Sequence, residues 1–475
     1  MKTIKFFIIA VIMTGITACE LLQPDDIINP NVDEDAFLQS PNAMQSWVNG
    51  TNKSFAASIS SYIELTEILS DNYFNNYTQS SKVFDIPRIL HTDVDVTNMQ
   101  RYIGTFREMA NYGINTVAKI DAKTTNEELF NLYYIKGYSF LLAGEYFVGV
   151  PIEVGGEVKD WKVNLREAII TLNEALLYAA NDSDKAFINT LIARAYHKLG
   201  DKANAASFAG IALSLSRDFI KNVEFDGKNG ANSSIQSYVY GTNFQPLPRL
   251  DFLDPKYFQL TALEQRPIAI AKAEEPHLIL VEAFLADKEP EAARQEMKDL
   301  LTLVKNRPVQ TGINDQLEGR YNGGFKVYPN SSAYRVAASP TEPFRSNLVL
   351  DRQDSKLIAI PYVSGTSVDE AMIDNASSTE DLLEILYLMR QEIFFAEGRR
   401  ASDLGIRLPV CEIEAANTAS AFGYIQAQIP PFIPLEQGMD AFEMDEVAKT
   451  VVIKYNMNKV LASNKSSEYV IPFFN

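Results

Sequence analysis

One stretch of the sequence, residues 195–215, restricts the fold more than any other feature, because it has the spacing of a tetratricopeptide repeat. It reads AYHKLGDKANAASFAGIALSL. In such a repeat, small residues let two antiparallel helices approach each other, and an aromatic residue fills the groove between them. Ala205 and Phe208 fit those two roles, while Gly200 and Asp201 fit the tight turn. A helix pair of this kind cannot bury its own apolar face, so it requires helical neighbours.

Apolar residues at positions i, i+3 and i+4 indicate further amphipathic helices along most of the chain. Residues 41–69 are expected to form two helices, 41–57 and 59–69, and residues 379–399 one long helix. A short strand is expected at residues 447–455, with little other β-structure. The helical repeats are therefore placed at about 41–69, 126–215, 277–305 and 379–399, and the fold class is mostly α.

Three long segments rich in Gly, Asn, Pro and Tyr separate these helices, at about 71–98, 222–268 and 308–375. Loops longer than about 15 residues are uncommon unless they have a function. These segments interrupt the helical pattern without ending it. We therefore expect one domain, residues 36–475, in which the loops form insertions.

The N-terminus has the pattern of a secretory signal peptide over residues 1–18. Two lysines precede an unbroken apolar run at residues 6–13, and small residues then lead to Cys19. So short a run cannot cross a bilayer as a helix. Cys19 lies where a bacterial lipoprotein would be cleaved and acylated, which predicts a lipid anchor followed by an acidic leash at residues 19–35. The alternative is an ordinary signal peptide with an incidental cysteine.

Composition excludes several functional classes. The chain has 43 Lys and Arg against 61 Asp and Glu, for a net charge of -18, and so acidic a surface repels nucleic acid. Two cysteines, Cys19 and Cys411, are too few for a disulfide framework or a cysteine-rich zinc site. The sequence also lacks a Walker A motif, a GxGxxG motif and a GxSxG motif. We expect no enzyme activity, no cofactor and no bound metal.

Residues 390–409 read RQEIFFAEGRRASDLGIRLP, and this segment resembles the SusD (RagB/SusD) family. The resemblance includes, in chain order, Cys19, the helix that stops at residues 149–151, and the repeat at residues 195–215. Members of that family are surface lipoproteins of Bacteroidota that lie over a SusC-type TonB-dependent barrel in the outer membrane. The resemblance implies tetratricopeptide-like helix pairs on one side and a ligand face built from loops on the other. It also implies capture of a nutrient, usually an oligosaccharide and sometimes a peptide, without catalysis.

Three charged residues of that segment, Glu397, Arg400 and Asp403, follow an apolar helix face. Ion pairs there would fix the end of the helix on its neighbours. The alternative is a pair of carboxylates at a catalytic site. We expect the structural role, because no loop of catalytic character follows.

Ligand-binding residues are expected in two of the long loops. Aromatic rings suit the C–H faces of a sugar, and amide side chains suit its hydroxyls. Residues 71–79 are the densest in both, and residues 321–334 are the second candidate. The predicted ligand-binding residues are Asn72, Tyr73, Phe74, Asn76, Tyr77, Tyr321, Tyr328 and Tyr334. The alternative is that these loops fold onto the body of the protein.

Other functions stay open at this point. A peptide ligand competes with a glycan, because only two tryptophans occur and neither lies in a candidate loop. A tetratricopeptide scaffold that binds only proteins is a further alternative, since helical repeats commonly do so. A lipid-anchored glycan hydrolase would need two carboxylates across a cleft, and no motif indicates such a pair.

Overall fold

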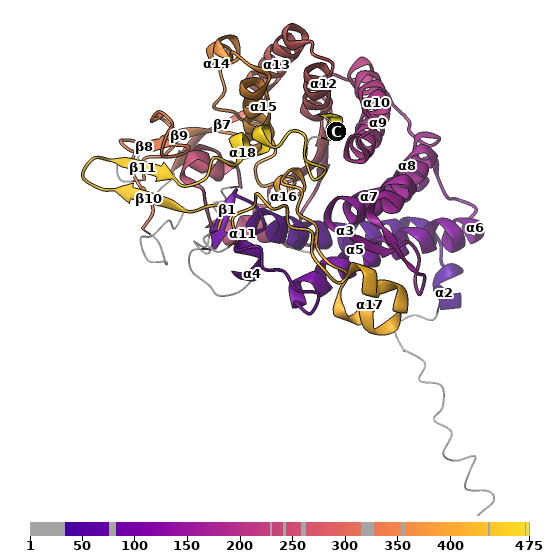
Figure 1. The fold of residues 1–475 in the computed structure, drawn as a ribbon. Helices are drawn as coiled ribbons and strands as arrows, with labels where there is room; N and C mark the ends of the chain where they lie inside the picture. The colour runs from indigo at the N-terminus through magenta and orange to yellow at the C-terminus, as the bar shows by residue number, and fades with distance from the viewer. Residues whose placement is uncertain are drawn as a thin grey trace, which may run out of the picture.

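Helices dominate the computed structural model, and several of its short strands lie together at one edge of the molecule, on the left in Figure 1. The structure describes residues 34–75, 82–228, 230–240, 244–257, 263–314, 327–352, 357–435, 438–470 and 472–474. The predicted mostly α class is confirmed. The predicted signal peptide, Cys19 and nearly all of the predicted leash lie outside the described residues.

Six helices follow one another in an arc through the middle of the chain (Figure 1). Each helix packs against the next, and α10 also packs against α12 across the intervening segment. These are the helices expected within residues 126–215 and 277–305. Their bounds are α7 Asn126–Tyr146, α8 Trp161–Leu176, α9 Asp182–Leu199, α10 Lys202–Leu215, α12 Glu274–Ala286 and α13 Pro290–Lys305.

The turn between α9 and α10 has the geometry that a tetratricopeptide repeat requires. Gly200 has φ 77°, in the left-handed region that favours glycine. The Asp201 carboxylate then caps α10 by accepting a hydrogen bond from the Asn204 N–H at 3.1 Å. Across the pair, the rings of Tyr196 and Phe208 stack with their centroids 5.6 Å apart. The predicted helix pair is confirmed.

The N-terminal helix pair was predicted wrongly. Residues 41–69 do not fold back at residue 58; they form one continuous helix, α3 (Ala43–Ile68). No glycine or proline stands at the expected break, so nothing ends the helix there. Its antiparallel neighbour is α5 (Val94–Tyr112), which packs against α3 and begins inside the segment expected to be a loop.

The long helix expected at residues 379–399 also ends early. Helix α15 (Thr379–Ile393) stops six residues before that bound. Ala396 and Gly398 then adopt left-handed φ angles of 56° and 67°, which a helix cannot continue through. A short helix, α16 (Arg400–Asp403), follows, and α18 (Met457–Ser463) packs on α15.

The strands are short and come mostly from the long segments between the helices. The strand expected at residues 447–455 is β11, in a hairpin with β10, and β8 pairs with β11 in parallel. Four two-stranded sheets contribute the other strands. The strands are β1 Tyr73–Asn75, β2 Gly149–Pro151, β3 Val158–Asp160, β4 Ile220–Val223, β5 Phe244–Pro246, β6 Ile268–Lys272, β7 Val309–Asn314, β8 Arg335–Ala337, β9 Leu357–Pro361, β10 Phe442–Asp445 and β11 Thr450–Ile453. Short helical elements complete the chain: α2 Glu34–Leu38, α4 Lys82–Asp85, η2 Gly113–Val117, α6 Ala118–Ile120, α11 Ser234–Tyr240, η3 Pro248–Tyr257, α14 Glu370–Asn375, α17 Glu412–Asn417, η5 Ala419–Tyr424 and η6 Pro472–Phe474.

Buried ion pairs fix the segment around α16 to the rest of the molecule, as expected for its three charged residues. The Arg400 guanidinium donates to the carboxylate of Asp71, just after α3, at 2.6 and 3.0 Å. The Asp403 carboxylate accepts from Arg390 at 2.8 and 2.9 Å and from Lys198 at 3.1 Å. Glu397 accepts from Lys272 at 2.7 Å and from Lys256. All these side chains are buried, so the three residues have a structural role here.

Two glutamates of α3 predict how stability depends on pH. Burial, aided by the nearby charge of Asp95 and opposed by a hydrogen bond with Ser234, raises the pKa of Glu64 to about 8. Burial also raises the pKa of Glu67 to about 7. The folded chain therefore keeps protons that the unfolded chain releases above its ordinary glutamate pKa of about 4.5. Stability from this source is present below that pKa and is lost as pH rises through 7 to 8.

Between pH 5 and pH 8, we expect Glu64 alone to lower the free energy of urea unfolding by roughly 3 kcal/mol. Glu64→Gln should remove this part of the dependence, because the amide does not titrate, and leave the part that comes from Glu67. Glu446→Gln, on an exposed turn, is the matched control and should leave the slope unchanged. An equal slope in wild type and Glu64→Gln would contradict the assignment.

Candidate functional site

The described residues of the first predicted ligand loop are buried. The Tyr73 ring stacks on Phe395 at 5.0 Å, and its hydroxyl donates to the Asp254 carboxylate at 3.1 Å. Asn72 donates to Glu67 at 2.8 Å through its side-chain amide. These residues lie where β1 pairs with β5 in the interior. Asn76 and Tyr77 lie outside the described residues.

The second predicted loop also packs inward where it is described. The Tyr328 hydroxyl donates to Asp251 at 3.1 Å, and its ring lies 6.2 Å from that of Phe74. Tyr334 is 3% exposed and packs under the ammonium of Lys449, 4.9 Å from its ring centroid. Tyr321 lies outside the described residues.

These positions correct the prediction of an open aromatic surface. The five described members of the predicted set have no exposed ring or amide that a ligand could reach. These two segments are rich in Tyr and Asn because they pack in the core, where their hydroxyl and amide groups bond to buried carboxylates. The five are Asn72, Tyr73, Phe74, Tyr328 and Tyr334, each 3% exposed or less.

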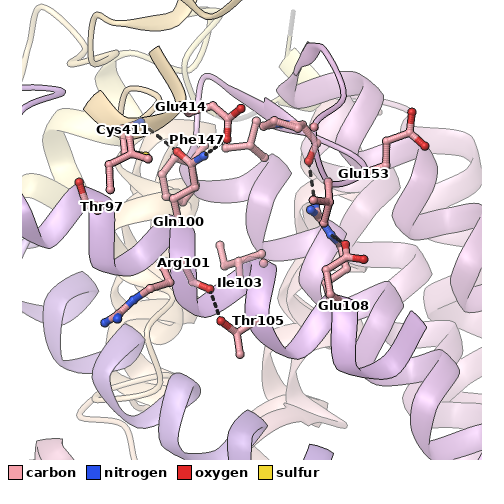
Figure 2. Close-up of a pocket in the computed structure, with 17 residues that line it drawn as sticks. Thr97, Gln100, Arg101, Ile103, Thr105, Glu108, Phe147, Glu153, Cys411 and Glu414 are labelled. Atoms are coloured by element: carbon pink, nitrogen blue, oxygen red, sulfur yellow. Dashed lines mark hydrogen bonds and ion pairs between the residues drawn. The ribbon is translucent and has the colours of Figure 1, made fainter. Parts of the chain in front are cut away.

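An open cavity of about 500 Å³ lies elsewhere, between α5, the turn after β2 and α17 (Figure 2). We call it the α5–α17 cavity. Its walls are largely apolar, with buried side chains at the back and two exposed aliphatic side chains, Val154 and Ile413, 76% and 60% exposed. The buried apolar side chains are Ile103, Phe147 and Val150. Such a mixture of apolar wall and polar rim is typical of ligand sites.

Gln100 organises the α17 side of this cavity (Figure 2). Its amide oxygen accepts from the Cys411 N–H at 2.9 Å, and its amide nitrogen donates to the Glu414 carboxylate at 3.3 Å. Burial raises the pKa of Glu414, although the Arg107 charge partly lowers it. One α5 side chain thus positions both the start of α17 and a carboxylate on the rim.

Arg107 organises the opposite side, where it ties α5 to the turn after β2. It is 6% exposed and donates to the Pro151 carbonyl at 2.8 Å and to Glu108 at 3.0 Å. Burial lowers its pKa, and Glu108 opposes that effect. Figure 2 shows Glu153 on the same side of the cavity as Glu108 and away from Gln100.

The chemistry of the α5–α17 cavity suits binding. Burial raises the pKa of the Cys411 thiol, which keeps it protonated at neutral pH and weakens it as a nucleophile. Within the described ranges, no group of three or more His, Cys, Asp or Glu side chains could hold a metal ion. The cavity offers hydrogen-bonding groups around an apolar wall, which can hold a ligand that has one apolar and one polar face.

Sequence reasoning missed this site because its three parts are distant in the chain. The signal that was available is the apolar period of α5, where Val96, Met99, Ile103 and Phe106 share the buried face. That period would have identified the helix. It would not have placed the helix beside Val154 and Ile413.

Comparison with known proteins identifies the fold. No protein-family model matches the sequence, and no curated protein does. Several solved structures are similar. A SusD superfamily protein from Bacteroides fragilis is 13% identical, with a TM-score of 0.53 over 81% of this chain and 99% of that one. A SusD-like protein from Bacteroides fragilis NCTC 9343 is 10% identical, with a TM-score of 0.53 over 82% and 99%. A proposed sugar-binding protein from Bacteroides vulgatus ATCC 8482 is 12% identical, with a TM-score of 0.52 over 81% and 98%.

Proposed function

Because the chain has the SusD-like fold, we propose that it captures a nutrient at the cell surface, and that this nutrient is an oligosaccharide. The observation that carries the proposal is the extent of the fold similarity, which reaches 81% of this chain and 98% or more of two solved relatives. One of those relatives is named as a proposed sugar-binding protein. The α5–α17 cavity supplies an open site of suitable chemistry.

The proposal includes an anchor and a partner. Cys19 would carry the lipid that holds the protein on the outer membrane, and a SusC-type TonB-dependent barrel would receive the ligand. Within the part of the chain that the structure describes, no helix has the length and apolar character needed to cross a membrane.

The ligand would lie with a C–H face against the aliphatic wall at Val154 and Ile413. Gln100, Glu108 and Arg101 stand around that wall, and their side chains can bond to hydroxyls. Asn76, Tyr77 and Tyr321 remain in the proposal as further ligand contacts.

A peptide is the second candidate ligand, and the chemistry of the wall favours it. Its exposed apolar residues, Val154 and Ile413, are aliphatic, whereas the ring of Phe147 is buried. Sugars are usually held by exposed aromatic faces, while aliphatic walls suit apolar peptide side chains. A binding screen that includes both ligand classes decides between them.

The test is a screen of the mature chain, by calorimetry, against plant, host and microbial oligosaccharides and mixed peptides. We expect saccharide binding that weakens about tenfold or more in Val154→Asp and Ile413→Asp, since a charge replaces the apolar contact. Both residues are exposed, so the fold should persist. The matched control is Val447→Asp, at a position that is 96% exposed and does not line the cavity.

Retention of peptides alone would replace the glycan by a peptide. Saccharide binding that is unchanged in both variants but lost in Tyr77→Ala or Tyr321→Ala would move the site away from the α5–α17 cavity. Binding of neither class, with or without the barrel partner, would contradict the proposed function.

A further inference from the structure

A second cavity, of about 510 Å³, has a different chemistry. It lies between the start of α8, the end of α9, α12, the α15–α16 region and residues 468–470. It has no lining residue in common with the α5–α17 cavity. Charged and polar side chains make up most of its lining, in contrast to the apolar walls of the first cavity. We call it the α9–α16 cavity.

Most of the charges that line it are already paired. The Asp403 carboxylate is held by Arg390 and Lys198. One oxygen of Glu282 lies 2.8 Å from Nε2 of His197. The remaining carboxylate of the lining, Glu468, is on an exposed segment near the C-terminus.

Two cations of the lining, Arg407 and Lys162, have no such partner. Within the described part of the chain, no carboxylate lies within ion-pair distance of either. Arg407 is only 7% exposed, and its one hydrogen bond there, from Nε to the Gly144 carbonyl, is long at 3.5 Å. Its guanidinium lies 4.0 Å from the centroid of the Trp161 ring, and the Lys162 ammonium lies 5.2 Å from the same ring.

Both cations line the α9–α16 cavity and lie against the same indole ring. Attraction to the aromatic face compensates each of them in part. A buried guanidinium normally has a hydrogen-bonded anion, and Arg407 has none among the described residues. An anion in the cavity would meet this requirement.

Glu145 is the carboxylate that acts on Arg407 from the protein interior. It is 1% exposed, and neither of its oxygens has a hydrogen-bond partner among the described residues. Its charge also acts on Arg194, Arg399 and Lys198. Burial lowers the pKa of Arg407 to about 10 despite Glu145, so Arg407 is still cationic at neutral pH and only partly compensated.

We propose that the α9–α16 cavity binds a small molecule through an oxyanion, held by Arg407 and Lys162. A guanidinium donates two parallel hydrogen bonds to a carboxylate, phosphate or sulfate, and an ammonium adds a point charge. The chain as a whole has a net charge of -18, which repels anions from most of the surface. Two cations without a carboxylate partner in one cavity therefore distinguish this cavity from the rest of the acidic surface. The proposal does not depend on the proposed function.

The test is calorimetric titration of the mature chain with inorganic sulfate, inorganic phosphate and glucuronate, with glucose as the uncharged control. We expect saturable binding of at least one anion and none of glucose. Binding should weaken as sodium chloride is added, because salt screens the charges. Tighter binding of glucuronate would identify an acidic sugar as the ligand, whereas tighter binding of sulfate or phosphate would identify an inorganic oxyanion.

Variants separate this site from general attraction of anions. Arg407→Met should weaken binding about tenfold or more, and Lys162→Met about threefold, since charge-assisted hydrogen bonds are lost. Arg217→Met, at an exposed arginine outside the cavity, should bind like wild type. Lys162 is exposed, so its variant stays folded and decides the question even if Arg407→Met does not fold. Absence of anion binding, or equal binding by Lys162→Met and wild type, would overturn the proposal.

Discussion

Replacing Glu275 by Gln is expected to lower the free energy of unfolding by about 3–5 kcal/mol, which is the cost of breaking a buried ion pair. Glu275 is 1% exposed. Its carboxylate accepts from Arg194 at 2.8 and 2.7 Å and also from Arg399. The amide would leave two buried guanidiniums without a counter-charge. Since domains are typically stable by only about 5–15 kcal/mol, the midpoint of urea unfolding should fall markedly.

A matched control is Glu157→Gln, which removes the carboxylate of an exposed ion pair. Glu157 lies 2.7 Å from Lys159, and the two side chains are 73% and 40% exposed. Water screens such a pair, so the unfolding midpoint should not change. If Glu275→Gln unfolds at the same midpoint as this control, the buried pairing does not stabilise the fold.

The loss of stability at acid pH provides a second test of the role of Glu275. Burial alone would raise its pKa, but Arg194 and Arg399 outweigh burial and lower the pKa to about 2. A lowered pKa contributes stability that is present above the ordinary glutamate pKa of about 4.5 and is lost as pH falls toward 2. Wild type should therefore lose stability in this window faster than Glu275→Gln.

The sequence predicted those elements whose signals are local. The turn at Gly200 needs a left-handed residue, and α7 begins at a capping box of Thr125 and Glu128. Such signals lie within a few residues of the element they bound. The end of α15 was misjudged because Ala396, a good helix former, adopts a left-handed φ. Contacts of Glu397 and Arg400 with distant segments hold the chain there, and these are not visible in a window of sequence.

The candidate site was less predictable than the fold, for the same reason. Tyr73 and Tyr328 have the composition of a sugar-binding loop, but their hydroxyls bond to buried carboxylates and their rings are covered. Residue type predicts the chemistry of a side chain, whereas exposure depends on which segments pack over it. The α5–α17 cavity joins segments near residues 100, 150 and 411. No short sequence motif predicts that these three segments lie side by side.

Replacing Cys19 by Ser is expected to abolish attachment of the protein to the membrane. Stable anchoring requires more than one acyl chain, because each buried CH₂ adds only about 0.8 kcal/mol and a single chain binds marginally. A lipoprotein cysteine carries several chains, and serine has no thiol to accept them. In cells grown with radiolabelled palmitate, the label and the membrane-bound fraction should both disappear.

The chain provides its own control for this prediction, since Cys411 is the other of its two cysteines. Cys411 is 5% exposed and heads α17 beside the α5–α17 cavity. Cys411→Ser should keep both the palmitate label and the membrane fraction, because its thiol is buried away from any acylating enzyme. If Cys19→Ser stays in the membrane fraction, the N-terminus is an ordinary signal peptide, and the protein must reach a barrel partner without a lipid. If Cys411→Ser loses the palmitate label and Cys19→Ser keeps it, Cys19 is not the lipid anchor.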